Sequence, residues 1–326
     1  MRVCVLGATG TIGRAAVAEL VRRGYEVVCL VRPQSGAAGN AARENLARLR
    51  ELAVVREVDL ADPASLRSAF AGQAFSAVLS CMASRSGVPE DAWAVDYHAQ
   101  SAVLAAAKEA GVGHFILLSA ICVQKPVLAF QHAKLAFEAE LAASGMRYSI
   151  VRPTAYFKSL SGQIERVRQG KAFLIFGDGS LTACKPISDR DLAAYLADCL
   201  EDESKWDRIL PIGGPGRAIT PRQQGEALFA MLGRPPKFRS VPLAFLDGVI
   251  AVLRALGRVV PSLAAKAELA RIGRYYAAES MLVLNQQTGC YDADATLSTG
   301  GDTLFEYYQA VVDGAATPER GDHAVF

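Results

Sequence analysis

The chain has 326 residues, of which 51% are hydrophobic and 21% are charged, and its formal net charge is +2. This length supports a substantial buried core, in one large domain or in two unequal domains. The near-neutral charge gives no electrostatic basis for binding nucleic acid or strongly acidic partners. The mean hydropathy of +0.19 is high for an enzyme and leaves room for contact with a membrane surface.

The seven cysteines are odd in number, lie mostly in apolar segments and form no Cys-x-x-Cys pair. This usage predicts buried thiols in a reducing compartment rather than disulfides or a zinc site. The four histidines also lack metal-ligand spacing, so we expect no metal ion held by the protein itself. A strand-like segment begins almost at Met1 and no long uncharged run follows, so we expect a cytoplasmic protein without a signal peptide or membrane span.

The first fourteen residues organise the rest of the chain. An apolar run of strand length leads into Gly-Ala-Thr-Gly-Thr-Ile-Gly at residues 7–13, and a helical pattern follows over residues 14–23. Gly7 permits a tight turn, Gly10 lets the backbone approach a pyrophosphate, and Gly13 allows close packing of helix on strand. The helix N-terminus then offers free N–H groups to the phosphates. Arg14 follows Gly13, so the Gly-Lys-Ser/Thr ending of a mononucleotide-binding loop is missing.

Strands and helices alternate as far as residue 120. Strand patterns cover residues 25–31, 53–58, 75–80 and 114–120, and helical patterns cover residues 41–52, 62–70 and 92–110. This alternation predicts an α/β fold with a doubly wound parallel sheet, the Rossmann arrangement. Such sheets bind ligands beyond the carboxyl ends of their strands, which places the glycine loop and four further strand ends along one crevice.

The ends of the second and third strands bear on the choice of cofactor. Arg32 follows the second strand, where NAD-binding folds usually carry a carboxylate for the ribose hydroxyls. A cation there suits a 2′-phosphate, so NADPH is favoured over NADH, and Ser35 is a candidate phosphate donor. The alternative for Arg32 is an ordinary loop charge. Asp59, followed by Leu60, is placed to reach the adenine amino group.

The alternation loosens after residue 155. We therefore expect a nucleotide-binding domain at 1–155, a smaller substrate region at 156–312 with some segments returning to the core, and a poorly ordered tail at 313–326. Residues 173–180 predict a hairpin-like element around Gly-Asp-Gly, and a helix is expected from Thr220. Residues 241–265 are apolar but interrupted by charges, which predicts an amphipathic helical region. Core or dimer packing is its default role, with a lid over the substrate or contact with a bilayer surface as alternatives.

The glycine motif, the cation after the second strand, Asp59-Leu60 and Leu118-Ser119-Ala120 resemble the extended or atypical short-chain dehydrogenase/reductases over about the first 155 residues. In that superfamily a Tyr-x-x-x-Lys pattern reduces carbonyls. Here the matching segment is Phe130-Gln-His-Ala-Lys134, so the lysine is present and phenylalanine replaces the proton-donating tyrosine. This departure disfavours ordinary ketone chemistry.

A narrower resemblance covers most of the chain. Segments at residues 130–138, 152–160, 185–192, 210–216, 220–226 and 232–238 resemble the divinyl chlorophyllide 8-vinyl reductases. The resemblance implies NADPH-dependent reduction of the 8-vinyl group to ethyl on a chlorophyllide or protochlorophyllide, an oxidoreductase reaction at a CH–CH group in chlorophyll or bacteriochlorophyll biosynthesis. It also implies that magnesium is bound in the tetrapyrrole substrate and not by the protein. A location at the periphery of a photosynthetic membrane is compatible with such a substrate.

The catalytic candidates are Lys134, Ser119, Tyr156 and His132. Lys134 is expected to orient the nicotinamide ribose and to contribute positive charge. The proton donor stays open: Ser119 ends a strand in the crevice, Tyr156 follows a strand exit, and His132 lies on a different helix face from Lys134. Each also has a simpler interpretation, as a strand-end hydroxyl, a pocket wall or a surface histidine.

The predicted cofactor-binding residues are Gly7, Thr9, Gly10, Thr11, Ile12, Gly13, Arg32, Ser35, Asp59, Leu60, Ser80, Cys81, Met82, Lys134 and Pro153. Two other functions stay open. One is a quinone reductase or other reductase of the same superfamily, which Phe130 disfavours for carbonyls. The other is a non-catalytic NADPH-binding regulator, which stays open because the fold by itself does not decide function. The retained Lys134 disfavours this alternative.

Overall fold

A computed structural model describes residues 1–33 and 40–317 of the chain. Within these residues the central element is an eight-stranded sheet in the order β12-β8-β6-β5-β4-β1-β2-β3, and every neighbouring pair of strands is parallel. The strands are β1 (Arg2–Leu6), β2 (Glu26–Val31), β3 (Val54–Glu57), β4 (Ala77–Ser80), β5 (His114–Leu118), β6 (Arg147–Pro153), β8 (Arg208–Gly213) and β12 (Leu297–Ser298). The predicted α/β class with a doubly wound parallel sheet is confirmed.

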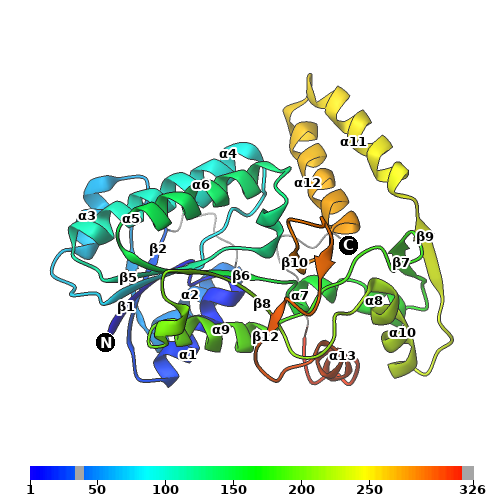
Figure 1. The fold of residues 1–326 in the computed structure, drawn as a ribbon, viewed down its shortest axis with the longest axis horizontal. Helices are drawn as coiled ribbons and strands as arrows, with labels where there is room; N and C mark the ends of the chain where they lie inside the picture. The colour runs from blue at the N-terminus through cyan, green and yellow to red at the C-terminus, as the bar shows by residue number, and fades with distance from the viewer. Residues whose placement is uncertain (34–39, 318–326) are drawn as a thin grey trace.

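Helices cover both faces of this sheet (Figure 1). One face carries α1 (Thr11–Arg22), α2 (Asn40–Leu52) and α9 (Asp189–Asp198), and the other carries α3 (Pro63–Phe70), α5 (Gln100–Glu109) and α6 (Ala129–Ala143). Because successive side chains of a strand point to opposite faces, Val3 and Val5 of β1 enter one buried cluster, and Cys4 and Leu6 enter the other. The strand patterns are apolar without interruption for this reason.

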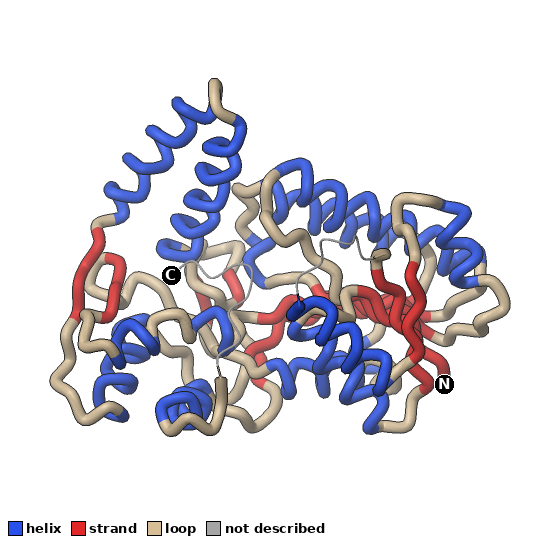
Figure 2. The backbone as a smooth tube through the Cα atoms, turned by 180° about the vertical axis from the view of Figure 1, so that it is seen from behind, coloured by secondary structure: helices blue, strands red, loops and turns tan. Residues whose placement is uncertain are grey.

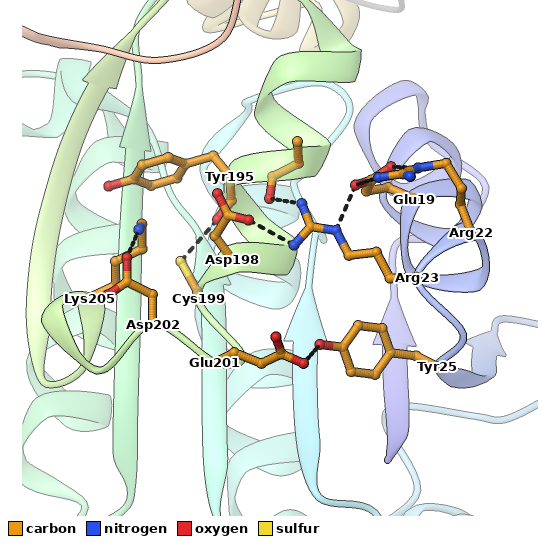
Figure 3. A network of polar contacts seen from close by, with 11 residues as sticks. Glu19, Arg22, Arg23, Tyr25, Tyr195, Asp198, Cys199, Glu201, Asp202 and Lys205 are labelled. Atoms are coloured by element: carbon orange, nitrogen blue, oxygen red, sulfur yellow. Dashed lines mark hydrogen bonds and ion pairs between the residues drawn. The ribbon is translucent and has the colours of Figure 1, made fainter.

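Arg23, just after α1, joins that helix to α9 (Figure 3). Its guanidinium binds Glu19 Oε1 at 2.7 Å and Asp198 Oδ1 at 2.7 Å, and it donates to the Ala194 carbonyl at 3.1 Å. Tyr25 adds a hydrogen bond from its hydroxyl to Glu201. A helix from the second half of the chain therefore fixes the helix that follows the glycine loop.

The connection between β4 and β5 is helical almost throughout. It runs from α4 (Pro89–Ala92) through a π-helical segment, Trp93–Ala99, into α5. The predicted helix at 92–110 is thus present, with a π-helical part that the periodicity does not reveal. At α3 the predicted N-cap is confirmed, since Asp62 accepts hydrogen bonds from the N–H groups of Ala64 at 2.9 Å and Ser65 at 3.1 Å.

The second half of the chain builds a smaller body around a third buried cluster. Its elements are α7 (Phe157–Leu160), α8 (Ile164–Arg168), β7 (Phe173–Phe176), α10 (Pro221–Met231), β9 (Phe238–Val241) and α13 (Leu304–Val312), with short strands β10 (Val283–Leu284) and β11 (Tyr291–Asp292) nearby. The predicted hairpin at 173–180 is wrong. The Gly-Asp-Gly turn forms, but β7 pairs in parallel with β9, a strand more than sixty residues later.

Two helices, α11 (Leu243–Gly257) and α12 (Pro261–Ala278), form a hairpin that projects from the body (Figures 1 and 2). The predicted helical region at 241–265 therefore consists of the end of β9, all of α11 and the start of α12. No residue of α11 is buried. Among the helices of the described residues, none is both long enough and apolar enough to cross a bilayer. Of the tail predicted at 313–326, residues 318–326 lie outside the described residues.

Candidate active site

Two glycines of the loop at the end of β1, Gly7 and Gly13, have no room for a side chain. Gly7 has φ +70°, and a Cβ atom on it would lie 2.5 Å from the carbonyl carbon and oxygen of Cys81. A Cβ atom on Gly13 would lie 2.1 Å from the Gly7 oxygen. Gly10, the N-cap of α1, provides no side-chain hydrogen bond, so the first-turn N–H groups of Thr11, Ile12 and Gly13 point to an open end. Close backbone packing and a free helix N-terminus fit a dinucleotide diphosphate.

Several of the predicted cofactor residues lie around this loop. Arg32 is exposed at the end of β2, and Ser35 lies outside the described residues. Asp59 is exposed, and its Oδ1 already accepts a hydrogen bond from the Ala61 N–H at 2.9 Å, while the next residue, Leu60, is buried. The carboxylate keeps free acceptor positions on both oxygens, so the adenine contact predicted for Asp59 stays a prediction.

The end of β4 lies against the glycine loop. Ser80 is completely buried and donates to Gln100 Oε1 at 2.8 Å, so its hydroxyl is occupied within the protein. Cys81 is partly exposed, and burial of its thiol raises the pKa to about 12, which keeps it neutral. Met82 is buried, as is Pro153 at the end of β6, and both side chains are apolar.

Lys134, on α6, forms an ion pair that the sequence pattern does not indicate. Its Nζ lies 2.9 Å from Asp96 Oδ1, and the two side chains are 11% and 1% exposed. The Ser84 N–H also donates to that oxygen, at 3.3 Å. Asp96 Oδ2 is buried and has no hydrogen-bond partner within the described residues. Asp96 lies in the π-helical segment before α5, a type of irregularity that is frequent at functional sites.

Phe130 lies one helical turn before Lys134 and is buried against the C-terminal half of α12. It shares an apolar cluster with Ile272 and Tyr275. The ring at the superfamily's tyrosine position therefore packs the helical hairpin onto the nucleotide-binding half. Within this arrangement Phe130 has no polar atom to offer to a substrate.

Ser119 is held by a buried charged network. Its hydroxyl donates to Glu138 Oε1, and Arg152 of β6 pairs with the same carboxylate, with Nε 3.2 Å from each carboxylate oxygen. Ser119 and Glu138 are 4% and 3% exposed. Glu138 lies one turn after Lys134 on α6, so this network fixes the helix that carries the lysine. His132, by contrast, is exposed on α6.

Two phenols, those of Tyr156 and Tyr276, lie close to Cys122. Burial raises the pKa of Tyr156, and the thiols of Cys81 and Cys122 lie close enough to add to the shift. Within the described residues the Tyr156 hydroxyl has no hydrogen-bond partner, yet it is not among the fully enclosed unpaired atoms. Tyr276 of α12 also reaches Cys122, with its hydroxyl 3.7 Å from the sulfur, and the residue as a whole is 40% exposed. The structure thus brings Tyr156 toward the helical hairpin.

Comparison with known proteins decides the family. An NAD(P)H-binding family model matches residues 7–203. The chloroplastic divinyl chlorophyllide a 8-vinyl-reductase of Oryza sativa subsp. indica is 51% identical, over 99% of this chain and 82% of that protein. The protein of the same name from Arabidopsis thaliana is 48% identical, over 99% of this chain and 79% of that protein. The chain belongs to the divinyl chlorophyllide a 8-vinyl-reductase family. The resemblance found in the sequence is confirmed.

Solved structures agree with the fold of this 8-vinyl-reductase family member. The NADPH complex of the quinone oxidoreductase QOR2 from Escherichia coli matches with a TM-score of 0.66 at 20% identity, over 95% of this chain and 99% of that one. At such an identity the likeness concerns the fold alone. NAD(P)H binding is supported by the family model, whose match begins at Gly7.

The expected cytoplasmic location is wrong. Four 8-vinyl-reductases that are 48–51% identical to this chain are chloroplastic proteins. The expectation depends on the lack of an apolar secretory leader, and that lack does not distinguish the cytoplasm from a plastid, whose import signals are amphipathic rather than apolar.

Four side chains of this site escape prediction from the sequence: Asp96, Glu138, Arg152 and Tyr276. Asp96 and Lys134 are 38 residues apart, and only the packing of α6 on the π-helical segment brings them together. An acidic residue in an otherwise alanine-rich helical pattern is the one available signal for Asp96. Within the described residues, no group of three or more histidine, cysteine or acidic side chains is arranged to hold a metal ion.

Proposed function

We propose that this chain uses NADPH to reduce the 8-vinyl group of divinyl chlorophyllide or protochlorophyllide to an ethyl group. The observation that carries this function is 48–51% identity, over 99% of the chain, to four reductases named for that reaction. The enzyme is an oxidoreductase acting on a CH–CH group of a tetrapyrrole. In this proposal residues 1–155 bind the dinucleotide and residues 156–312 bind the pigment, which brings its own magnesium.

The chemistry of a vinyl group suits a site without a tyrosine at position 130. Bound NADPH supplies a hydride, which adds to the terminal vinyl carbon. Negative charge then develops on the inner carbon, where conjugation with the macrocycle spreads it. The protein therefore has to fix the geometry and deliver one proton, and it needs a weaker acid than ketone reduction requires. Phe130 is compatible with this task.

Arg32 supports NADPH over NADH. Its guanidinium is exposed at the end of β2, the position from which Rossmann folds recognise the 2′ group of the adenosine ribose. It also lies within electrostatic reach of the Asp91 carboxylate on α4, across the mouth of the crevice. An anionic 2′-phosphate is attracted to this arginine, whereas NADH offers it only neutral hydroxyls.

Lys134 is assigned to the nicotinamide ribose, with Asp96 as its positioning residue. The buried carboxylate holds the ammonium at a fixed place, because an unpaired charge at 11% exposure is costly. The unpaired Asp96 Oδ2 keeps one strong acceptor beside the lysine. The pair orients a ribose hydroxyl and contributes positive charge close to the reacting carbon.

Tyr156 is the proton donor that the geometry favours among the three candidates. The Ser119 hydroxyl already donates a hydrogen bond to Glu138, and His132 is exposed on α6. The Tyr156 hydroxyl is unpaired within the described residues and lies beside Cys81, at the edge of the glycine loop. Burial keeps the phenol protonated, and a carbanion conjugated with the macrocycle is basic enough to take its proton.

The α11–α12 hairpin is proposed to cover the flat pigment and to reach a membrane surface with its tip. Phe245, Val252 and Leu256 are 62%, 58% and 52% exposed, so α11 presents apolar surface that the described residues leave uncovered. At the tip Val259 is 84% exposed and lies between Arg258 and Val260. An apolar tip beside a basic residue fits an anionic bilayer surface, and the pigment itself is apolar.

The function is tested with purified protein, NADPH and divinyl chlorophyllide or divinyl protochlorophyllide, followed by chromatographic separation of vinyl and ethyl pigments. We expect the ethyl pigment, with kcat/KM at least about tenfold higher for NADPH than for NADH. Arg32→Gln should lower the ratio of kcat/KM for NADPH to kcat/KM for NADH, without changing kcat at saturating cofactor. NADPH consumption without ethyl pigment, or reduction of ketones alone, would contradict the proposal.

The donor assignment is tested with Tyr156→Phe, which keeps the ring. We expect kcat to fall about a hundredfold while the KM values for pigment and NADPH change little. Ser119→Ala provides the comparison, because it removes a hydroxyl from the same crevice but one that is already bound to Glu138. A larger loss of kcat in Ser119→Ala, at equal thermal stability, would reassign the proton to the serine.

A further inference from the structure

Lys158 brings an ammonium group to the N-terminal end of α1. It lies on α7, directly after β6, and its Nζ donates a hydrogen bond to Thr11 Oγ1, the hydroxyl of the first residue of α1. The two residues are 147 positions apart, so the contact links the segment that follows β6 to the first turn of α1. The patterns that mark the glycine loop do not include this lysine.

The charges at this contact are unusual for a purely structural tether. A helix N-terminus carries a partial positive charge, and cations are favoured at the opposite end of a helix. The first turn of α1 contains no acidic residue, and Gly10 supplies no side-chain cap. Among the described residues no carboxylate forms an ion pair with Lys158. The ammonium of Lys158 and the positive N-terminal end of the α1 dipole therefore meet at Thr11, and no acidic side chain among the described residues pairs with Lys158 there. A bound anion relieves the repulsion between these two positive charges.

We propose that Lys158 is a cofactor-binding residue whose ammonium holds the dinucleotide diphosphate against the first turn of α1. The N–H groups of Thr11, Ile12 and Gly13 bind the phosphate oxygens from the helix side, and Lys158 binds them from the β6 side. Thr11 holds the ammonium in place with its hydroxyl. Diphosphate is the anion favoured here, because Gly7 and Gly13 belong to the tightly packed glycine loop beside which this fold binds phosphates.

The contact has a consequence for the order of binding. Tyr156 lies two residues before Lys158, on the same segment that leaves β6. A diphosphate held by Lys158 therefore steadies the segment that carries the phenol before pigment enters. This consequence rests on the proposed donor role of Tyr156, whereas the diphosphate contact rests only on the NAD(P)H-binding fold. Binding experiments without pigment separate the two.

The test measures binding of NADP⁺ and of adenosine 2′-monophosphate, which lacks the diphosphate, to the wild-type chain and to Lys158→Met by calorimetry without pigment. We expect Lys158→Met to weaken NADP⁺ at least about tenfold, because a charge-assisted hydrogen bond is lost. Adenosine 2′-monophosphate should keep its affinity within about twofold. Lys158→Arg should restore most of the NADP⁺ affinity, and the loss should shrink as salt is raised.

Lys171→Met is the matched control, because Lys171 is an exposed lysine of the same half of the chain. Thermal unfolding of all variants shows whether they fold. Unchanged NADP⁺ affinity in Lys158→Met would overturn the proposal, and so would an equal loss for both nucleotides, which indicates a damaged helix end. A raised KM for a free-acid pigment but not for its methyl ester, with NADP⁺ unaffected, would assign the lysine to a carboxylate of the substrate and also overturn it.

Discussion

The nucleotide-binding half and the α11–α12 hairpin differ in what specifies them. Strand β1 is buried on both faces, and Gly7 and Gly13 are so tightly enclosed that a single added carbon would overlap backbone. Helix α11 buries no residue, and its Gly248 has no atom within 4 Å of an added Cβ. The first region is determined by packing within the chain. The second presents apolar surface that the described residues leave uncovered, which is where a pigment-binding element is expected.

The two regions meet at α6, where the largest effect is expected. Lys134→Met should lower kcat by at least about a hundredfold. It should also cost about 3 kcal/mol of stability, because Asp96 is left charged and buried without its partner. The double variant Asp96→Asn with Lys134→Met should regain most of the stability in urea unfolding and none of the turnover. Recovery of turnover in the double variant would remove the lysine from the chemistry.

Alanine substitutions in helical glycines separate the regions directly. Gly13→Ala should weaken NADP⁺ about a hundredfold and destabilise the fold by about 2 kcal/mol, because its Cβ meets the Gly7 oxygen. Gly248→Ala in α11 should leave NADP⁺ affinity unchanged and stabilise the protein by up to about 1 kcal/mol. Calorimetry and denaturant unfolding measure both quantities. Equal changes in NADP⁺ affinity and in stability at the two glycines would show that the difference in packing does not determine cofactor binding.

Acid sensitivity should arise in the nucleotide-binding half, since α11 and α12 contain no histidine. Burial, with a contribution from Arg147, lowers the pKa of His114 from 6.5 to about 4. A lowered folded-state pKa means that the unfolded chain binds the proton more readily. The stability from neutral His114 is therefore complete above pH 6.5 and falls by about 3 kcal/mol by pH 4.

The variant His114→Gln should lose much less stability than the wild type between pH 6.5 and pH 4. His132→Gln, at an exposed position, should follow the wild type over the same range. Urea unfolding at each pH gives the comparison. A slope that is the same in all three proteins would place the acid sensitivity outside His114.

A smaller effect is expected in the hairpin. Leu256→Asp should raise the KM for pigment about tenfold, because a charge is placed on the apolar face, and should leave the NADPH affinity unchanged. Leu52→Asp is the matched control, since Leu52 is a similarly exposed leucine, 48% against 52%, at the end of α2. If the control raises the pigment KM equally, or if Leu256→Asp affects neither constant, the hairpin does not cover the pigment.

The same difference between the two regions explains how much of the structure could be predicted from the sequence alone. The glycine spacing, the apolar strands and the Asp62 cap are local signals, and they predict the sheet, the tight turn after β1 and the start of α3 correctly. The pairing of β7 with β9 joins segments more than sixty residues apart, so the local Gly-Asp-Gly turn suggests a hairpin that does not form. The roles proposed for Asp96 and Lys158 depend on distant contacts, with Lys134 and Thr11. Periodicity carries no information about such contacts.

The central claim is that hydride goes from NADPH to the terminal vinyl carbon while the protein supplies one proton to the inner carbon. The direct measurement uses NADPH deuterated at the transferred C4 position in ordinary water, and unlabelled NADPH in deuterated water, with mass spectrometry and NMR of the ethyl pigment. The account predicts cofactor deuterium in the methyl group and solvent deuterium in the methylene group. Cofactor deuterium in the methylene group, or none in the pigment, would contradict it.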